Sequence, residues 1–212
     1  MMQSSIRRNS ILLGLFAVLT TNIIAGTYLG TRERIAEEQR KARERALLEI
    51  VPRAAHDNAM LDDTLPIGGA GELGLGEERE LFVARQDGSV VAVILPVIAP
   101  DGYSGEIELI VGINRDGTVA GARVLAHKET PGLGDKVDLN KSDWILGFDG
   151  RSLTDPTPDR WKVKKDKGEF DQFTGATITP RAVTAAVKEA LEYFAANRSR
   201  LLDDQELTRV GR

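Results

Sequence analysis

The sequence predicts an α+β fold in which a long N-terminal helix precedes one globular domain. Three observations support this class: an uncharged apolar stretch at residues 11–30, two pairs of strand-like segments joined by short turns, and a helix-like apolar period near the C-terminus. Strands joined by short turns lie antiparallel. We therefore expect a mainly antiparallel sheet with helices packed on it.

Residues 11–30 have the length of a membrane span, because 20 helical residues extend about 30 Å. The competing interpretation is a cleaved signal peptide, which Arg7, Arg8 and the small residues at 25–27 would fit. The length of the stretch favours a retained transmembrane helix, with residues 1–10 as a cytoplasmic tail. Basic residues flank the span on both sides, so charge alone does not fix its orientation.

Polar residues lie within this span, at Thr20, Thr21 and Asn22. One interpretation is that they face a partner helix in the membrane, where their hydrogen bonds are met. The other is that their side chains bond to carbonyl groups of their own helix. The sequence leaves both open.

After the span, residues 31–51 are rich in Arg, Glu, Ala and Leu, with opposite charges four residues apart, and predict a solvated helical stalk that Pro52 ends. Residues 52–80 are rich in glycine and predict a linker or loop. The domain itself should occupy residues 81–198, with 199–212 as a C-terminal tail.

Within the domain, residues 81–85 and 90–95 flank Asp87-Gly88, a typical hairpin turn, and residues 107–113 alternate before a turn into residues 119–125. Residues 161–163 are a further candidate strand. Residues 182–197 carry apolar side chains at helical spacing, so they predict a helix with one buried stripe. Thr179 would cap that helix and Pro180 would be its first residue.

Composition excludes several kinds of chemistry. The chain has no cysteine, and thus no disulfide, thiolate nucleophile or cysteine-bound metal cluster. With two histidines, we expect no metal site. The net charge of -4 argues against a nucleic-acid partner. Any redox chemistry would therefore depend on a bound organic cofactor.

The segment most informative about function is residues 171–180, DQFTGATITP. Thr177 lies just before the expected helix, whose N-terminus presents unpaired N–H groups and a partial positive charge. That end favours a phosphate, and Gly175 and Ala176 leave room for a bulky group to approach the Thr177 hydroxyl. By spacing alone this is also an ordinary junction between a loop and a helix.

Asp171, Thr174, Gly175, Ala176 and Thr177 resemble the acceptor motif that periplasmic flavin transferases modify, in which flavin mononucleotide (FMN) from FAD is joined to the last threonine. Further segments resemble the other signatures of FMN-binding domains: Gly102-Tyr103-Ser104-Gly105, Asp116-Gly117 and residues 129–134, ETPGLG. The chain as a whole resembles the G subunits of Rnf-type ion-translocating ferredoxin:NAD oxidoreductases. The related C subunits of sodium-pumping NADH:quinone oxidoreductases are the alternative.

The resemblance implies a covalent FMN on Thr177, and no catalytic residue of the chain's own. It also places Thr130, Leu133 and Gly134 near the flavin ring, and we favour that contact over the alternative, a plain tight turn after a strand. The expected cofactor-binding residues are Thr177, Asp171, Thr174, Gly175, Ala176, Glu129, Thr130, Leu133 and Gly134.

The same resemblance implies a place in the cell and a set of partners. These are the bacterial inner membrane with the domain in the periplasm, the other subunits of the redox complex, and a flavin transferase during maturation. Electrons would arrive from a membrane iron–sulfur centre and pass to a second covalent flavin.

Rival functions are a non-redox anchored adaptor and a hydrolase that uses His127 or Asp135. Trp144 is expected to fill the core, and Lys164 and Lys165 to be solvated.

Overall fold

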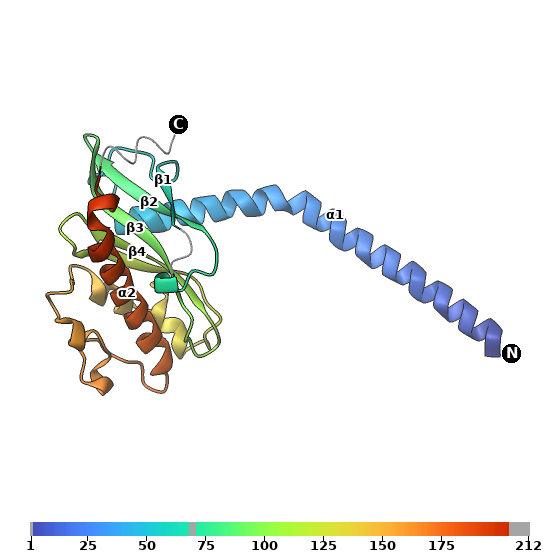
Figure 1. Cartoon of the computed structure of the whole chain (residues 1–212). Coiled ribbons are helices and arrows are strands. Elements are labelled where there is room, and N and C mark those ends of the chain that lie inside the picture. Colours follow the sequence, from blue (N-terminus) through green and yellow to red (C-terminus); the bar gives the residue numbers. More distant parts are fainter. Residues whose placement is uncertain (1, 68–70, 204–212) are drawn as a thin grey trace. The chain divides into compact units, whose positions relative to one another are not determined.

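The structure of the chain is a computed structural model that describes residues 2–67 and 71–203 (Figure 1). It consists of two compact units, one before Glu44 and one that begins there. The first unit is helical, and the second holds the sheet and the remaining helices.

Helix α1 (Met2–Ile50) is continuous and is long and apolar enough to cross a membrane. Thr20 Oγ1 donates to the Phe16 carbonyl (2.9 Å), and Asn22 Nδ2 donates to the Val18 carbonyl (2.7 Å). These side chains therefore meet their hydrogen bonds within their own helix, which is the second of the two interpretations, and they need no partner helix for that purpose.

The sheet has five strands in the order β1-β2-β3-β4-β5, and every neighbouring pair is antiparallel. The strands are β1 (Thr64–Ile67), β2 (Arg79–Gln86), β3 (Ser89–Ala99), β4 (Ile107–Asn114) and β5 (Val119–Ala126). This confirms the α+β class and both expected hairpins. The turn between β2 and β3 has Asp87 at φ 51° and Gly88 at φ 77°, the two positive values that a type I′ turn requires.

Strand β1 lies in the segment expected to be a linker, so that expectation is wrong at residues 64–67. The missed strand is short and contains Pro66, which a sheet tolerates because β1 is an edge strand. The residues before it are also fixed. Asn58 Nδ2 donates to the Val83 carbonyl (2.8 Å), and Arg85 N–H donates to Asn58 Oδ1 (2.9 Å).

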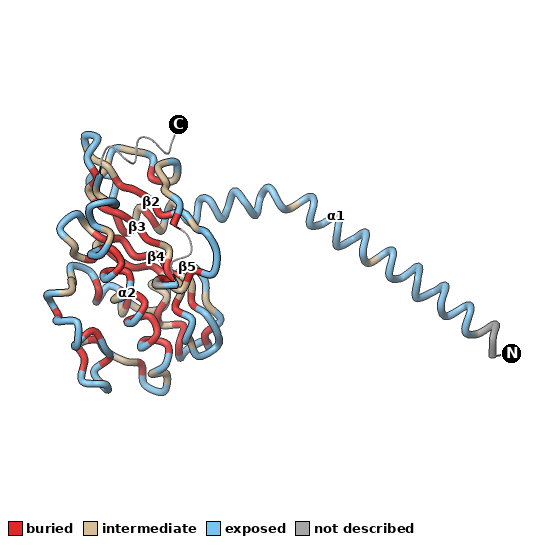
Figure 2. Tube along the Cα trace, viewed as in Figure 1, coloured by how far each residue is buried: buried red, intermediate tan, exposed pale blue. Residues whose placement is uncertain are grey.

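One face of the sheet packs against helix α2 (Ile178–Leu201) in the main hydrophobic core (Figures 1 and 2). Alternate residues of β4 enter this core and are at most 1% exposed. They are Ile107, Leu109, Val111 and Ile113. The expected stripe of α2 is buried as well, at Val183, Val187, Ala190, Leu191 and Phe194. Both amphipathic patterns are thereby confirmed.

The other face of the sheet packs against the last turn of α1, through Leu47 and Ile50 in a second core cluster. Gly112 of β4 and Gly121 of β5 are register partners there. A Cβ on Gly112 would overlap Ile50 Cγ2, and one on Gly121 would lie 3.4 Å from Ile50 Cγ1. The paired glycines thus form a socket for Ile50, and the expectation that the whole stalk is solvated is wrong at this end.

A buried arginine fastens the same turn of α1. Arg123 of β5 is 8% exposed, and its Nε lies 2.9 Å from Glu49 Oε2. Its other nitrogens donate to the carbonyl groups of Ala122 (2.7 Å) and Glu49 (3.3 Å). Because the guanidinium is hydrogen-bonded to three acceptors, its charge is buried with partners.

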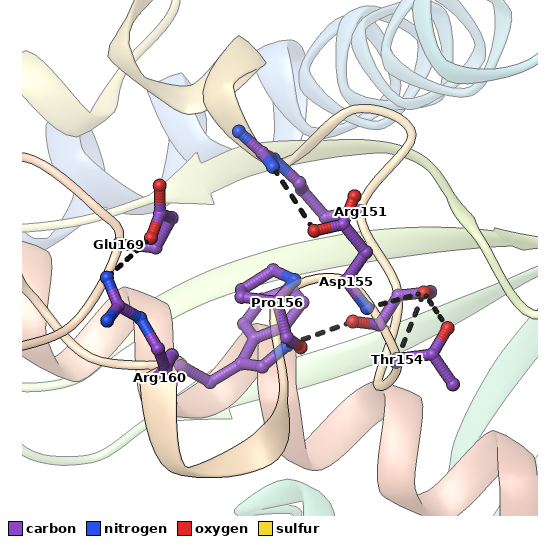
Figure 3. A network of polar contacts seen from close by, with 8 residues as sticks. Arg151, Thr154, Asp155, Pro156, Arg160 and Glu169 are labelled. Carbon is purple, nitrogen blue, oxygen red and sulfur yellow. Dashed lines mark hydrogen bonds and ion pairs between the residues drawn. The ribbon is translucent and has the colours of Figure 1, made fainter.

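Between β5 and α2 the chain forms short 3₁₀ turns: η2 (Gly134–Val137), η3 (Asp143–Phe148), η4 (Pro158–Arg160) and η5 (Lys164–Asp166); a further one, η1 (Gly71–Leu73), precedes β2. Figure 3 shows the polar network around residues 151–169. In it Arg160 pairs with Glu169 (2.9 Å). The Trp161 indole N–H donates to the Ser152 (3.0 Å) and Pro156 (3.1 Å) carbonyl groups.

The expected strand at residues 161–163 is wrong. Val163 makes one isolated bridge with Phe170, and the N–H of Lys162 bonds to the nearby Arg160 carbonyl. Trp161 and Val163 are nevertheless buried, so the apolar residues at 161–163 indicated a buried loop and not a strand.

Replacing Gly112 with alanine should destabilise the domain, because the added methyl group meets the buried Ile50 side chain. We expect the free energy of unfolding of the full chain in detergent to fall by about 1–3 kcal/mol in a urea titration. Gly147→Ala is the matched control, since a Cβ there meets nothing within 4 Å. Equal stability of Gly112→Ala and the control would contradict the socket.

Candidate FMN site at the start of helix α2

The first turn of α2 leaves one threonine hydroxyl free. The helix begins at Ile178, and Thr177 is its N-cap, at φ −80° and ψ −26°, without a hydrogen bond from its side chain to the helix. The Thr177 carbonyl accepts the N–H of Arg181 (3.3 Å). The Thr177 hydroxyl is therefore available to other chemistry at a helix N-terminus.

The expected cap at Thr179, with Pro180 as the first helical residue, is wrong by two positions. Thr179 Oγ1 donates to the carboxylate of Glu129, so it does not cap the helix. Pro180 lies in the first turn, where a missing N–H costs no helical hydrogen bond.

A tight turn presents the residues before Thr177. The N–H of Ala176 donates to the Phe173 carbonyl (3.1 Å), and Gly175 has φ 81°. These features are typical of a type II turn, in which the third residue takes positive φ and glycine is favoured. Thr174 and Gly175 are exposed, whereas Ala176 and Thr177 are partly buried.

Contacts on the other side of the turn hold it in place. The Asp171 carbonyl accepts the Trp144 indole N–H (2.7 Å), and the Trp144 ring packs edge-on against Phe173 with centroids 5.1 Å apart. Trp144 is thus a partly buried packing residue, as expected. Lys164 Nζ pairs with Asp171 Oδ1 (2.7 Å), so Lys164 is exposed but not merely solvated.

A second type II turn faces the first. The N–H of Leu133 donates to the Thr130 carbonyl (3.1 Å), and Pro131 and Gly132 (φ 79°) occupy the two central positions. A Cβ on Gly175 would lie 3.7 Å from Leu133 Cδ2, so the two turns are in near contact. The simple interpretation of residues 129–134 as a tight turn is correct, and the turn also borders the site.

Glu129 joins three segments beneath these turns. Its side chain is 5% exposed; Oε1 accepts the N–H of Ser104 (2.9 Å), and Oε2 accepts the Thr179 hydroxyl. Gly134 lies against it so closely that an added Cβ would overlap Oε2. We call Glu129, Ser104 and Thr179 the carboxylate clamp.

A cavity of about 350 Å³ opens between the two turns and the start of α2. Its lining residues are Tyr103, Glu129, Thr130, Leu133, Gly134, Gly175, Ala176, Thr177, Ile178 and Thr179. Seven of the nine residues expected from the sequence lie here, and Asp171 and Thr174 do not line it. Tyr103, Ile178 and Thr179 were not among the expected site residues, although all three lie in or beside the motifs that predicted the site.

An ion pair anchors η5 to the first turn of α2. Arg181 Nε and Nη2 donate to Asp166 Oδ2 (2.7 Å) and Oδ1 (3.0 Å). The hydrogen bond from Arg181 holds the pKa of the Asp166 carboxyl below its usual value. The guanidinium nearest to Thr177 in sequence is thus already paired, which leaves the helix N–H groups to meet an anion.

The rival hydrolase finds no support in the geometry. His127 Nδ1 accepts the N–H of Glu129 (3.1 Å), and no hydrogen bond between described residues joins His127 to Asp135. Within residues 2–67 and 71–203, no group of three acidic or histidine side chains is arranged to hold a metal ion.

Comparison with known proteins assigns the two parts of the chain to described families. Residues 102–192 match the model of the FMN-binding domain, and residues 1–50 match the model of the RnfG N-terminal region. The first match contains every residue that lines the cavity.

Relatives match nearly the whole chain. The G subunit of the ion-translocating oxidoreductase complex from Pseudomonas aeruginosa (strain UCBPP-PA14) is 54% identical, covering 95% of this chain and 94% of that protein. The G subunits of Shewanella loihica (50% identical; 95% and 95%) and Vibrio cholerae O1 strain M66-2 (48%; 94% and 95%) are similar. The chain therefore belongs to the family of G subunits of Rnf-type ion-translocating oxidoreductase complexes, electron-transfer subunits with an FMN-binding domain.

Proposed function

We propose that this chain holds FMN covalently, through a phosphoester on Thr177, and carries electrons within a membrane-bound, ion-translocating ferredoxin:NAD oxidoreductase. The observation that carries the proposal is the free hydroxyl of Thr177, which lies at a helix N-terminus and borders the cavity. The hydroxyl of an N-cap threonine usually accepts a hydrogen bond from a backbone N–H of the first helical turn, and the Thr177 hydroxyl does not.

The residues present fit the phosphate end of FMN. The N–H groups of Ile178 and Thr179 have no acceptor within the helix, because they precede its first hydrogen-bonded turn. Pro180 contributes no N–H. A phosphate ester on Thr177 would thus meet two backbone donors and the positive end of the α2 dipole.

The residues also fit a flat, largely apolar ring. Tyr103, Leu133 and Ile178 line the cavity and are 68%, 42% and 43% exposed. Large apolar side chains so exposed at the mouth of a cavity are unfavourable in water and gain from a ring that covers them. The buried polar side chains of this lining, Glu129 and Thr179, are already hydrogen-bonded to each other in the clamp.

FMN supplies the redox chemistry when bound, since its ring accepts and donates electrons. The chain's own residues position it. The two type II turns shape the mouth of the cavity, and the ester on Thr177 keeps the ring at a high local concentration outside the cytoplasm, where a free cofactor would be diluted.

The acceptor motif is open to a modifying enzyme. Thr174 and Gly175 form the exposed tip of their turn, and Asp171 is exposed beside it. A flavin transferase could therefore reach these residues and join FMN from FAD to the Thr177 oxygen, with AMP as the second product. Asp171 and Thr174 would then serve recognition by the transferase, which agrees with their position outside the cavity.

In the assembled complex, electrons would reach this flavin from a membrane iron–sulfur centre and leave to a second covalent flavin. Residues 11–30 would cross the inner membrane, residues 1–10 would lie in the cytoplasm and residues 81–198 would form the periplasmic flavin domain. The similarity of nearly the entire chain to G subunits favours this complex over the sodium-pumping quinone reductase.

Thr177→Val should abolish covalent flavin, because valine keeps the shape of threonine without its hydroxyl. Both proteins are produced with a flavin transferase, denatured, and digested with trypsin. In the wild type the peptide 168–181 should gain the mass of FMN less water, and fragmentation should place it on Thr177 and not on Thr174 or Thr179.

Thr154→Ala, an exposed threonine in another turn, is the control and should keep the added mass. An unmodified wild-type peptide would favour the non-redox adaptor.

The absence of cysteine allows a direct test of topology. Single cysteines are introduced by Arg7→Cys and Lys141→Cys, both at exposed positions. A membrane-impermeant maleimide added to spheroplasts should label Lys141→Cys and spare Arg7→Cys until the membrane is broken. The reverse pattern would place the domain in the cytoplasm.

A further inference from the structure

At the centre of the carboxylate clamp lies the buried side chain of Glu129. Both oxygens of Glu129 act as acceptors, from a backbone N–H and from a hydroxyl. The carboxylate is thus hydrogen-bonded on both oxygens by neutral groups, which leave its charge uncompensated. In the part of the chain that the structure describes, no ion pair involves Glu129.

An ionised side chain is costly to bury without a partner of opposite charge. A neutral side chain could join the same loops at lower cost. Arg123 of β5, by contrast, is a buried charge whose partner is Glu49. The unpaired negative charge at Glu129 therefore indicates a role other than stabilising the fold.

The position of Glu129 indicates that use, because the same side chain lines the cavity beside Thr177. Water is largely excluded from it, so its field is weakly screened and acts strongly over short distances. Reduction of a ring bound in this cavity adds negative charge close to the carboxylate. Like charges repel, and the reduced form is disfavoured.

We propose that Glu129 is a positioning residue that sets the reduction potential of the flavin: its buried charge lowers the potential, and the Ser104 N–H and the Thr179 hydroxyl moderate that effect. This rests on the proposed function, because it requires FMN in the cavity. It goes beyond it by assigning Glu129 an electrostatic role in place of a merely structural one.

The test is a potentiometric titration of the full-length, flavin-loaded protein in detergent, followed by flavin absorbance, with wild type and variants at the same pH. Glu129→Gln removes the charge and keeps the shape, so the midpoint potential should rise. Thr179→Val keeps the charge and removes a moderating donor, so the potential should fall below that of the wild type.

Opposite shifts from two neighbouring substitutions would not result from general loosening of the site. Glu106→Gln is the matched control, since it removes an exposed carboxylate close in sequence to the clamp. Water screens that charge, and the potential should not change.

A potential unchanged in loaded Glu129→Gln, or shifted in the same direction by both variants, would overturn the inference. If neither variant retains flavin while Glu106→Gln does, the clamp is a structural support and the inference also fails. These outcomes are distinct from failure of the proposed function, which would appear as a wild-type protein without flavin on peptide 168–181.

Discussion

The site depends on the Glu129 carboxylate, which accepts one hydrogen bond from Ser104 and one from Thr179. They join the loop before β4, the loop after β5 and the first turn of α2, which are separated by 25 and 50 residues. Because Thr179 is fixed in this way, α2 begins two residues earlier than its sequence suggests. That shift places Thr177 at the helix N-cap with its hydroxyl unused. The unused hydroxyl of Thr177 is thus a consequence of packing elsewhere.

The sheet supports this arrangement because both of its faces are covered. Helix α2 packs on one face and brings its N-terminus to the loops at the end of the strands. The last turn of α1 packs on the other, where Ile50 occupies a socket that side chains larger than glycine would fill. Neither helix could slide along the sheet without exposing apolar surface to water, at about 25 cal/mol per Å². The cavity therefore lies between elements whose positions are set by burial.

The sequence predicted what depends on local pattern. Period two in β4, a turn signal at Asp87-Gly88 and period 3.6 in α2 each gave the correct element, since burial and turn geometry act over a few residues. Features that depend on distant partners were missed. Strand β1 forms because it pairs with the edge of β2. Trp161 is buried in a loop, where its indole N–H donates to the Ser152 and Pro156 carbonyl groups. Thr179 bonds to a residue 50 positions away. Motif resemblance located the cavity, but it could not show that Asp171 and Thr174 lie outside its lining.

The burial of Leu47 and Ile50 means that the globular domain begins within helix α1. A shortened chain that starts at Val51 would uncover Phe82, Ile94 and Ile110 on the back of the sheet and leave Arg123 without its carboxylate. Starting at Glu44 retains all of these contacts. The final helical turn before Pro52 is thus integral to the FMN-binding domain, although its sequence pattern is that of the stalk.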